Sequence, residues 1–139
     1  MGISGGRSTQ ISNSTPIITP VAAECDANIL IGQPLYLKLN GHLDLASAVN
    51  NSKSQLIGIA TANSTPGFTA TYISFGTILL NDWTNIIDNA SLVPGLDYFL
   101  DSVPGKMTTV APNSGYWVYC GRAVTDKCLV VDFQLKIQL

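Results

Sequence analysis

A skeleton of glycines that occurs twice constrains the fold of this chain more than any other feature. The first copy runs, in order, through Gly32, Leu35-Tyr36-Leu37, Gly41-His42 and Gly58-Ile59-Ala60. The second copy runs through Gly95, Tyr98-Phe99-Leu100, Gly105-Lys106 and Gly121-Arg122-Ala123. In both copies the first and last glycines of the skeleton are 26 positions apart. We therefore predict one β-unit used twice, over residues 30–80 and 93–139.

Strand and turn patterns between these glycines predict an all-β domain. Asn40-Gly41 predicts a hairpin with a type I′ turn, which needs positive φ at both central residues. Cys128–Leu139 has an apolar residue at every second position, which predicts one long strand after a turn at Thr125-Asp126. No window has helical spacing over three turns, and only residues 81–89 leave room for a helical turn. The predicted fold class is all-β, a small barrel or sandwich built from two similar β-units.

The first twenty residues are expected to form an extended N-terminal arm, followed by a single β domain over residues 21–139. The arm is rich in Gly, Ser, Thr and Asn, which do not offset the entropy of ordering by themselves. Its candidate anchors are Ile11, Ile17 and Ile18. Two interpretations stay open: a disordered tail that leads into a first strand of the domain's own sheet, or an arm that gains order on a neighbouring subunit.

The low charge of the chain limits its partners. Of 139 residues, 46% are hydrophobic and only 12% are charged, against roughly 25% charged in a typical soluble domain. A surface of Ser, Thr, Asn and apolar groups suits burial in an assembly. The net charge of −2 provides no basic footprint, so we expect no nucleic-acid partner. We also expect no membrane partner, because the sequence shows neither a run of about 18 apolar residues nor a signal peptide.

The polar residues predict no catalytic site, no metal site and no cofactor. His42 is the single histidine and is expected to be exposed at a hairpin turn, which argues against Ser-His-Asp and Cys-His systems. Asp82 with Asp88, or Asp97 with Asp101, could pair for acid–base work or hold a cation. Each of them lies beside turn residues, however, where Asp commonly bonds to the backbone. The cysteines are expected to be buried and reduced: Cys25, Cys120 and Cys128.

Trp117 and Tyr119 are the candidate interface residues of the domain. Residues 116–119 lie on one predicted strand, so alternate side chains point to opposite faces. We expect one face to pack in the core and the other to be covered by a partner protein. The alternative is a platform on which a ligand such as a sugar stacks. Trp83, between the two units, is expected to be a core residue.

The ordered motifs of the chain resemble a module of structural proteins of tailed bacteriophages. The segments that carry the resemblance are NDWT, LVPGLDYFLD, PGKMTTVAP and GYWVYCGRAV, followed by the alternating strand. Upstream, LIGQPLYLKLNG and LIGIATA resemble the matching element of head-decoration (cement) proteins. Together these segments cover residues 21–139.

The resemblance implies a β-tulip-like barrel or sandwich with a polar N-terminal arm, in a virion structural protein that is not an enzyme. In cement proteins such domains gather as homotrimers, and the arm and one face hold neighbouring capsomers together. The implied partners are the major capsid protein and further copies of the chain. The implied location is the outer capsid surface of the virion, after synthesis in the host cytoplasm. The same module occurs in tail-fibre and baseplate proteins, so an adaptor or receptor-binding module is the alternative function.

Overall fold

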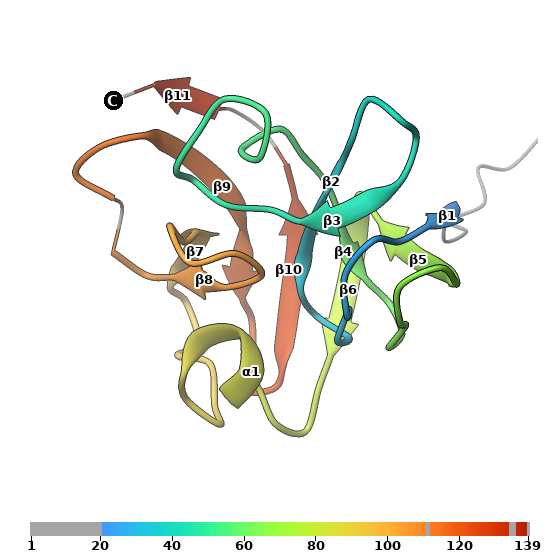
Figure 1. Cartoon of the computed structure of the whole chain (residues 1–139). Coiled ribbons are helices and arrows are strands. Elements are labelled where there is room, and N and C mark those ends of the chain that lie inside the picture. The colour runs from blue at the N-terminus through green and yellow to red at the C-terminus, as the bar shows by residue number, and fades with distance from the viewer. Residues whose placement is uncertain (1–20, 111, 134–135, 139) are drawn as a thin grey trace, which may run out of the picture.

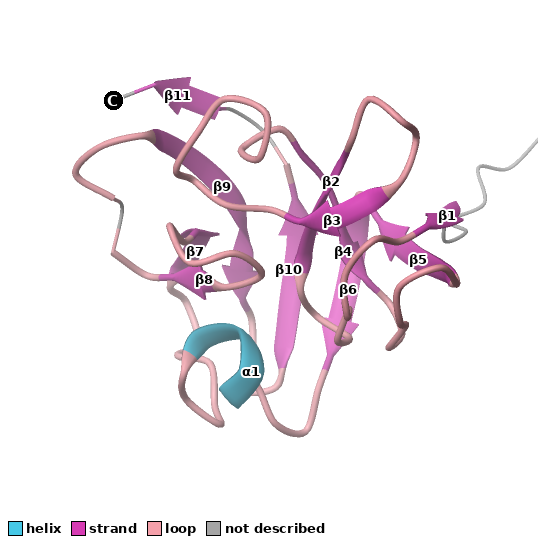
Figure 2. Cartoon of the chain, in the orientation of Figure 1, coloured by secondary structure: helices cyan, strands magenta, loops and turns pink. Residues whose placement is uncertain are grey.

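Almost all regular structure in the chain is β (Figures 1 and 2). The computed structural model describes residues 21–110, 112–133 and 136–138, so Ile11, Ile17 and Ile18 lie outside the described residues. The strands are β1 (Val21–Glu24), β2 (Pro34–Leu37), β3 (Leu43–Leu45), β4 (Leu56–Ala60), β5 (Thr69–Ile73), β6 (Phe75–Leu79), β7 (Asp97–Leu100), β8 (Met107–Thr108), β9 (Tyr116–Ala123), β10 (Cys128–Asp132) and β11 (Lys136–Gln138). The short helix α1 (Thr84–Ile87) lies in the segment where a helical turn was predicted. The predicted all-β class is confirmed.

The strands form two antiparallel sheets that share one strand order. The first sheet has the order β1-β5-β4-β2-β3. The second has the order β6-β10-β9-β7-β8, with β11 as a further partner of β9. Each strand of the first sheet therefore has a counterpart five strands later. Figure 1 shows β1 and β5 on one side of the molecule, β7 and β8 on the other, and β10 between them. The bounds of the sheets differ from those of the two predicted units, because β6 lies within residues 30–80 and belongs to the second sheet.

The correspondence extends to a β-bulge at the same place in both sheets. The register shifts by one residue between β2 and β4, and again between β7 and β9. The pairs that flank the shift are Leu35–Gly58 and Tyr36–Leu56 in the first sheet, and Tyr98–Gly121 and Phe99–Tyr119 in the second. Each residue of the second set lies 63 positions after its counterpart. Because a bulge bends its strand and increases the twist, both sheets are shaped at equivalent points.

The main core contains side chains from both sheets. The first sheet contributes Tyr36, Ile59 and Ile73, and the second contributes Ile78, Tyr98, Leu100, Val118, Leu129 and Val131. Trp83 is fully buried in this core, as expected, and its indole N–H donates a hydrogen bond to the carbonyl of Lys127 at 2.9 Å. A second cluster consists of Cys25, Ile29, Leu35, Leu43, Ala60, Ala70 and Tyr72. Since alternate strand residues point to opposite faces, the middle of the first sheet, formed by β2, β4 and β5, is buried on both faces.

The first sheet is rolled so that its two edges meet. Directly after β1, Cys25 forms an isolated parallel bridge with Leu43 of β3, the strand at the opposite edge. The Asp26 N–H also donates to the carbonyl of Leu43 at 3.0 Å. We call this contact of residues 24–26 with residues 42–43 the seam. Only Ser74 separates β5 of the first sheet from β6 of the second. The described strands form two separate sheets, joined at Ser74, that pack as a sandwich.

The hairpin predicted at Asn40-Gly41 is present, but its turn differs from the predicted type I′. Gly41 has a φ of 85°, but Asn40 does not have the positive φ that a type I′ turn requires. In the described part of the chain, Asp88 is the one non-glycine residue with positive φ. The Gly41 N–H donates to the Lys38 carbonyl at 2.9 Å, and the Lys38 N–H donates to the His42 carbonyl at 2.8 Å. This is a three-residue loop that ends in a left-handed glycine. Asn40 escapes the positive φ that a two-residue loop would demand.

The last predicted strand is interrupted. β10 ends at Asp132, and β11 begins at Lys136 and again pairs with β9. The preceding turn is also longer than the predicted Thr125-Asp126, because Val124 donates to the carbonyl of Cys128 across the loop. Leu129 and Val131 are nevertheless buried, as the alternation indicated. No helix in the described part of the chain is long and apolar enough to cross a membrane.

Candidate interaction face

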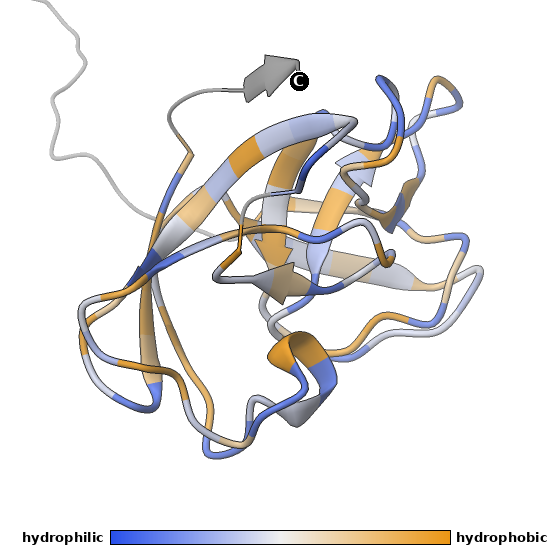
Figure 3. Cartoon of the chain, turned by 90° about the vertical axis from the view of Figure 1, so that its left-hand side faces the viewer, coloured by the Kyte–Doolittle hydropathy of each residue, from blue (hydrophilic) through white to orange (hydrophobic). Residues whose placement is uncertain are grey.

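One face of the second sheet is open. A row of paired residues crosses it from β6 to β7 and consists of Thr77, Val130, Arg122 and Asp97. Large apolar side chains flank this row, with Phe75 55% and Leu79 71% exposed. We call the following outward residues the open face: Phe75, Thr77, Leu79, Asp97, Phe99, Trp117, Tyr119, Arg122 and Val130. In Figure 3, hydrophobic (orange) and paler segments alternate along strands, as expected where one face packs in a core.

Trp117 and Tyr119, the predicted interface residues, both lie on the open face and both contact Phe99. The ring centroids of Phe99 and Trp117 are 5.3 Å apart, with the planes tilted by 32°. Those of Phe99 and Tyr119 are 5.9 Å apart in an edge-on arrangement. All three side chains are half-buried. The three rings therefore form one aromatic cluster, in which the Tyr119 contact is edge-on and the Trp117 contact is tilted.

A hydrogen-bonded ion pair borders these rings. Arg122 donates from Nε to Oδ1 of Asp97 at 2.8 Å and from Nη2 to Oδ2 at 3.3 Å. The Tyr119 hydroxyl donates to the same Oδ1 at 3.2 Å. The guanidinium of Arg122 holds the pKa of Asp97 below its usual range, and burial raises the pKa of Tyr119. Asp97 is therefore ionised and Tyr119 protonated at neutral pH, so the group is a fixed polar border of the face.

The first sheet shows how the same face is used in the other unit. The counterparts, 63 positions earlier, are Tyr36 for Phe99, Leu56 for Tyr119 and Ile59 for Arg122. Tyr36 and Ile59 are buried in the main core, and Leu56 packs against it. The second sheet therefore covers in the first unit the face that stays open in the second. The part of the open face on β7 and β9 is thus the counterpart of a surface on β2 and β4 that packs against the second sheet.

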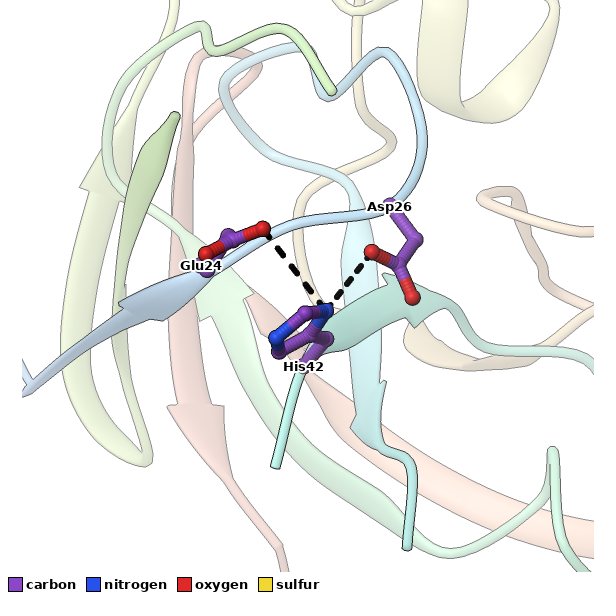
Figure 4. A group of neighbouring side chains, drawn as sticks. All are labelled: Glu24, Asp26 and His42. Carbon is purple, nitrogen blue, oxygen red and sulfur yellow. Dashed lines mark hydrogen bonds and ion pairs between the residues drawn. The ribbon is translucent and has the colours of Figure 1, made fainter. Parts of the chain in front are cut away.

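A separate polar group lies at the seam of the first sheet. Figure 4 shows Glu24, Asp26 and His42 with the imidazole between the two carboxylates. Nδ1 of His42 is 2.8 Å from Oδ1 of Asp26 and 3.8 Å from Oε2 of Glu24. The other oxygen of Asp26, Oδ2, accepts a hydrogen bond from Lys38 Nζ at 2.7 Å. Lys38 and His42 hold the pKa of Asp26 at about 2, below its ordinary 3.8.

This group escaped the sequence analysis, which placed His42 alone at an exposed turn. His42 is half-buried, and the two carboxylates reach it only because the sheet rolls and its edges meet. No motif spacing indicates such a contact. Among the described residues, Glu24, Asp26 and His42 are the one group of three or more His, Cys, Asp or Glu side chains close enough to share a metal ion.

The remaining candidate carboxylates are held by cations or by backbone. Asp88 accepts from Lys106 Nζ at 2.6 Å, and Asp82 accepts from the Thr84 N–H at 3.0 Å, beside the start of α1. Asp101 accepts from the Val103 N–H at 3.3 Å. These contacts are those of turns and surface ion pairs. The three cysteines are free, and burial raises the pKa of the Cys120 thiol, which keeps it protonated.

No known family model and no curated protein matches the sequence. Among solved structures, the chain is similar to one described as "The capsid of Myoviridae Phage XM1". The sequence identity is 18%, the TM-score is 0.49, and the match covers 88% of each chain.

Proposed function

We propose that the chain is a non-enzymatic virion protein of a tailed bacteriophage, which decorates the outer surface of the head and holds neighbouring capsomers together. The observation that carries the proposal is the open face of the second sheet, whose counterpart on β2 and β4 is buried. The motifs that resemble the module of tailed-phage structural proteins fall on α1, β7, β8 and β9, and two of these strands form part of that face. The motifs that resemble cement proteins fall on β2 and β4. The proposal does not depend on the likeness to phage XM1.

Burial of the open face supplies the driving force for such binding. Apolar surface removed from water contributes about 25 cal/mol per Å². Phe75, Leu79 and Val130 are 55%, 71% and 36% exposed on one face. The part of the open face around Phe99, Tyr119 and Arg122 has counterparts on β2 and β4 that pack against the second sheet, so such a face suits a protein partner. In this proposal the partner is the major capsid protein.

Repetition makes modest contacts effective. A protein that binds only the assembled lattice stabilises that lattice by mass action. In a homotrimer, three faces and three arms engage together, so the total affinity exceeds that of each contact. In this proposal residues 1–20 are the arm, and Ile11, Ile17 and Ile18 anchor it on a neighbouring subunit. Residues 21–139 form the domain that carries the open face.

The open face is tested with a Phe75→Ser, Leu79→Ser double variant. Because both side chains are exposed, each change should alter the free energy of unfolding by no more than about 0.5 kcal/mol. Binding to expanded heads that lack the protein should fall at least about tenfold, or 1.4 kcal/mol, as measured by co-sedimentation. The matched control is Leu39→Ser, at the fully exposed tip of a first-sheet hairpin, which should bind normally. Full binding by the folded double variant would rule the face out.

The arm and the location are tested separately. Deletion of Met1–Thr19 should leave the circular dichroism spectrum of a folded β domain and abolish decoration of heads. Full binding of the truncated protein to heads would contradict the arm hypothesis. Copy number per purified particle then decides the location, since hundreds of copies support decoration and a handful support a tail adaptor.

A further inference from the structure

We propose that Glu24, Asp26 and His42 form a binding site for a divalent transition-metal ion, best matched by Zn²⁺, and that the ion fastens the seam of the first sheet. The three side chains come from β1, from the residue after the Cys25 bridge and from the hairpin between β2 and β3. The site is on the first sheet and does not include the open face, so it stands independently of the proposed function.

The ligand atoms already converge. The three atoms lie within 4.8 Å of one another. Ligands about 2.0–2.1 Å from a tetrahedral zinc ion are about 3.3–3.4 Å apart. The distances from His42 Nδ1, 2.8 Å to Asp26 and 3.8 Å to Glu24, lie on either side of that separation. Small side-chain rotations would therefore seat an ion between the three atoms, which face one another in Figure 4.

The ligand types select the metal. Zn²⁺ accepts imidazole nitrogen together with carboxylate oxygen, whereas Ca²⁺ and Mg²⁺ prefer all-oxygen sites. Two carboxylates balance the charge of the ion. The side chains of Glu24, Asp26 and His42 are 48%, 28% and 32% exposed, so water can fill the fourth position.

Neighbouring groups orient the Asp26 carboxylate for this role. Lys38 Nζ and Asn40 Nδ2 both donate to Oδ2, at 2.7 and 3.5 Å. Oδ1 is thereby left directed at His42. Groups that hold the second oxygen of a ligating carboxylate fix its direction and tune the affinity of the site. The ammonium of Lys38 also offsets one of the two negative charges, which keeps the affinity moderate.

The site lies between the two edge strands of the first sheet, so a bound ion would link them. Glu24 belongs to one edge strand of the first sheet, and His42 directly precedes the other. Among the described residues of the seam, backbone pairing is limited to the Cys25–Leu43 bridge and the adjacent Asp26 bond. Because only the folded chain brings the three ligands together, an ion bound there stabilises the closed seam. It would hold β1 in place against β3.

The test is a titration of the full chain, without a histidine tag and freed of metal by EDTA, with ZnCl₂ in a calorimeter. We expect one ion per chain and a rise in melting temperature. His42→Gln and Glu24→Gln should each weaken zinc binding at least about tenfold, and CaCl₂ should bind at least about tenfold more weakly than ZnCl₂. Asp97→Asn, which removes a carboxylate from an exposed ion pair of the other sheet, is the matched control and should bind zinc normally.

Two variants make the outcome unambiguous. Cys128→Ser removes the half-buried free thiol and should keep the wild-type affinity. Circular dichroism of His42→Gln should match the wild type, since the side chain lies at the surface. Absence of zinc binding by the wild-type chain, an unchanged affinity in His42→Gln, or a loss in Cys128→Ser as large as in His42→Gln would each overturn the proposal.

Discussion

Single residues at the two bulges show why the glycine skeleton exists. A Cβ at Gly121 would lie 2.2 Å from the carbonyl oxygen of Val130. A Cβ at Gly58 would lie 2.2 Å from Cδ2 of Tyr72 and 2.9 Å from the carbonyl oxygen of Ile73. At both positions a neighbouring strand approaches too closely for any side chain. Gly58 and Gly121, the last glycines of the two skeletons, therefore mark the close approach of a neighbouring strand in each sheet.

Gly121→Ala should destabilise the protein by about 2–3 kcal/mol. The obstructing atom belongs to the backbone of β10, which pairs on both sides and has little room to move. Urea unfolding measures the change. Thr77→Ala, on the exposed face of the neighbouring strand β6, is the control and should stay within about 0.5 kcal/mol. Equal stability of the two variants would show that the strands can separate locally at no cost.

At the residue scale, the sequence predicted the spacing of equivalent positions in the two sheets better than it predicted contacts between distant side chains. The 26-residue interval of the glycines is visible in the chain and corresponds to equivalent bulges. The contact of His42 with Asp26 and Glu24 is not visible, because it depends on how far the first sheet rolls. The local sequence pattern predicts which residues pair within one hairpin. It does not predict contacts at the seam, because the seam joins the opposite edges of a sheet.

The β7–β9 pair differs from its counterpart at one informative position. In the first sheet Pro34 pairs with Ile59, and in the second Asp97 pairs with Arg122. Ile59 is buried in the main core, whereas Arg122 is exposed. The β7–β9 pair thus has an ion pair on its open face, at the position where the β2–β4 pair has two apolar residues. The two strands are held at this point by a charge-assisted contact that depends on pH.

Asp97→Asn should flatten the loss of stability in acid. Arg122 lowers the pKa of Asp97 in the folded state from the value near 3.9 expected in the unfolded chain. Ionised Asp97 therefore stabilises the fold above about pH 4, and this contribution is lost as the pH falls through the lowered pKa. Since the pair is largely exposed, the effect is small and weakens in salt. Melting temperatures between about pH 2 and pH 7 measure it, and identical pH profiles for both proteins would exclude this linkage.

Elements were predicted well where one strand alternates and less well where a loop decides the register. The buried positions Leu129 and Val131 follow from period-two alternation. The pairing of Leu129 with Ala123 does not, because the loop before Cys128 is longer than the turn that Thr125-Asp126 suggested. A single added loop residue changes which residues face each other across a hairpin.

At the scale of the whole molecule, the sequence left barrel and sandwich open. The choice depends on where sheet edges end and meet, and those contacts join residues distant in the chain, such as Cys25 and Leu43. The structure has two sheets of equal topology with unequal surroundings. The middle of the first sheet is buried on both faces, and the second keeps one face open. Two sheets of one topology thus share one internal interface and leave one external surface.

The shared core predicts that both units unfold in a single transition. Ile59 of the first unit and Leu100 of the second belong to the same buried cluster, so neither sheet buries that face without the other. Ile59→Ala should cost about 2–5 kcal/mol and lower one common melting temperature. Both tryptophans, Trp83 and Trp117, lie outside the first unit, so their fluorescence reports unfolding beyond it. In Ile59→Ala, fluorescence and far-ultraviolet circular dichroism should therefore shift together, with equal calorimetric and van't Hoff enthalpies. A fluorescence transition that stayed at the wild-type temperature while the dichroism signal moved would show that the first sheet unfolds alone.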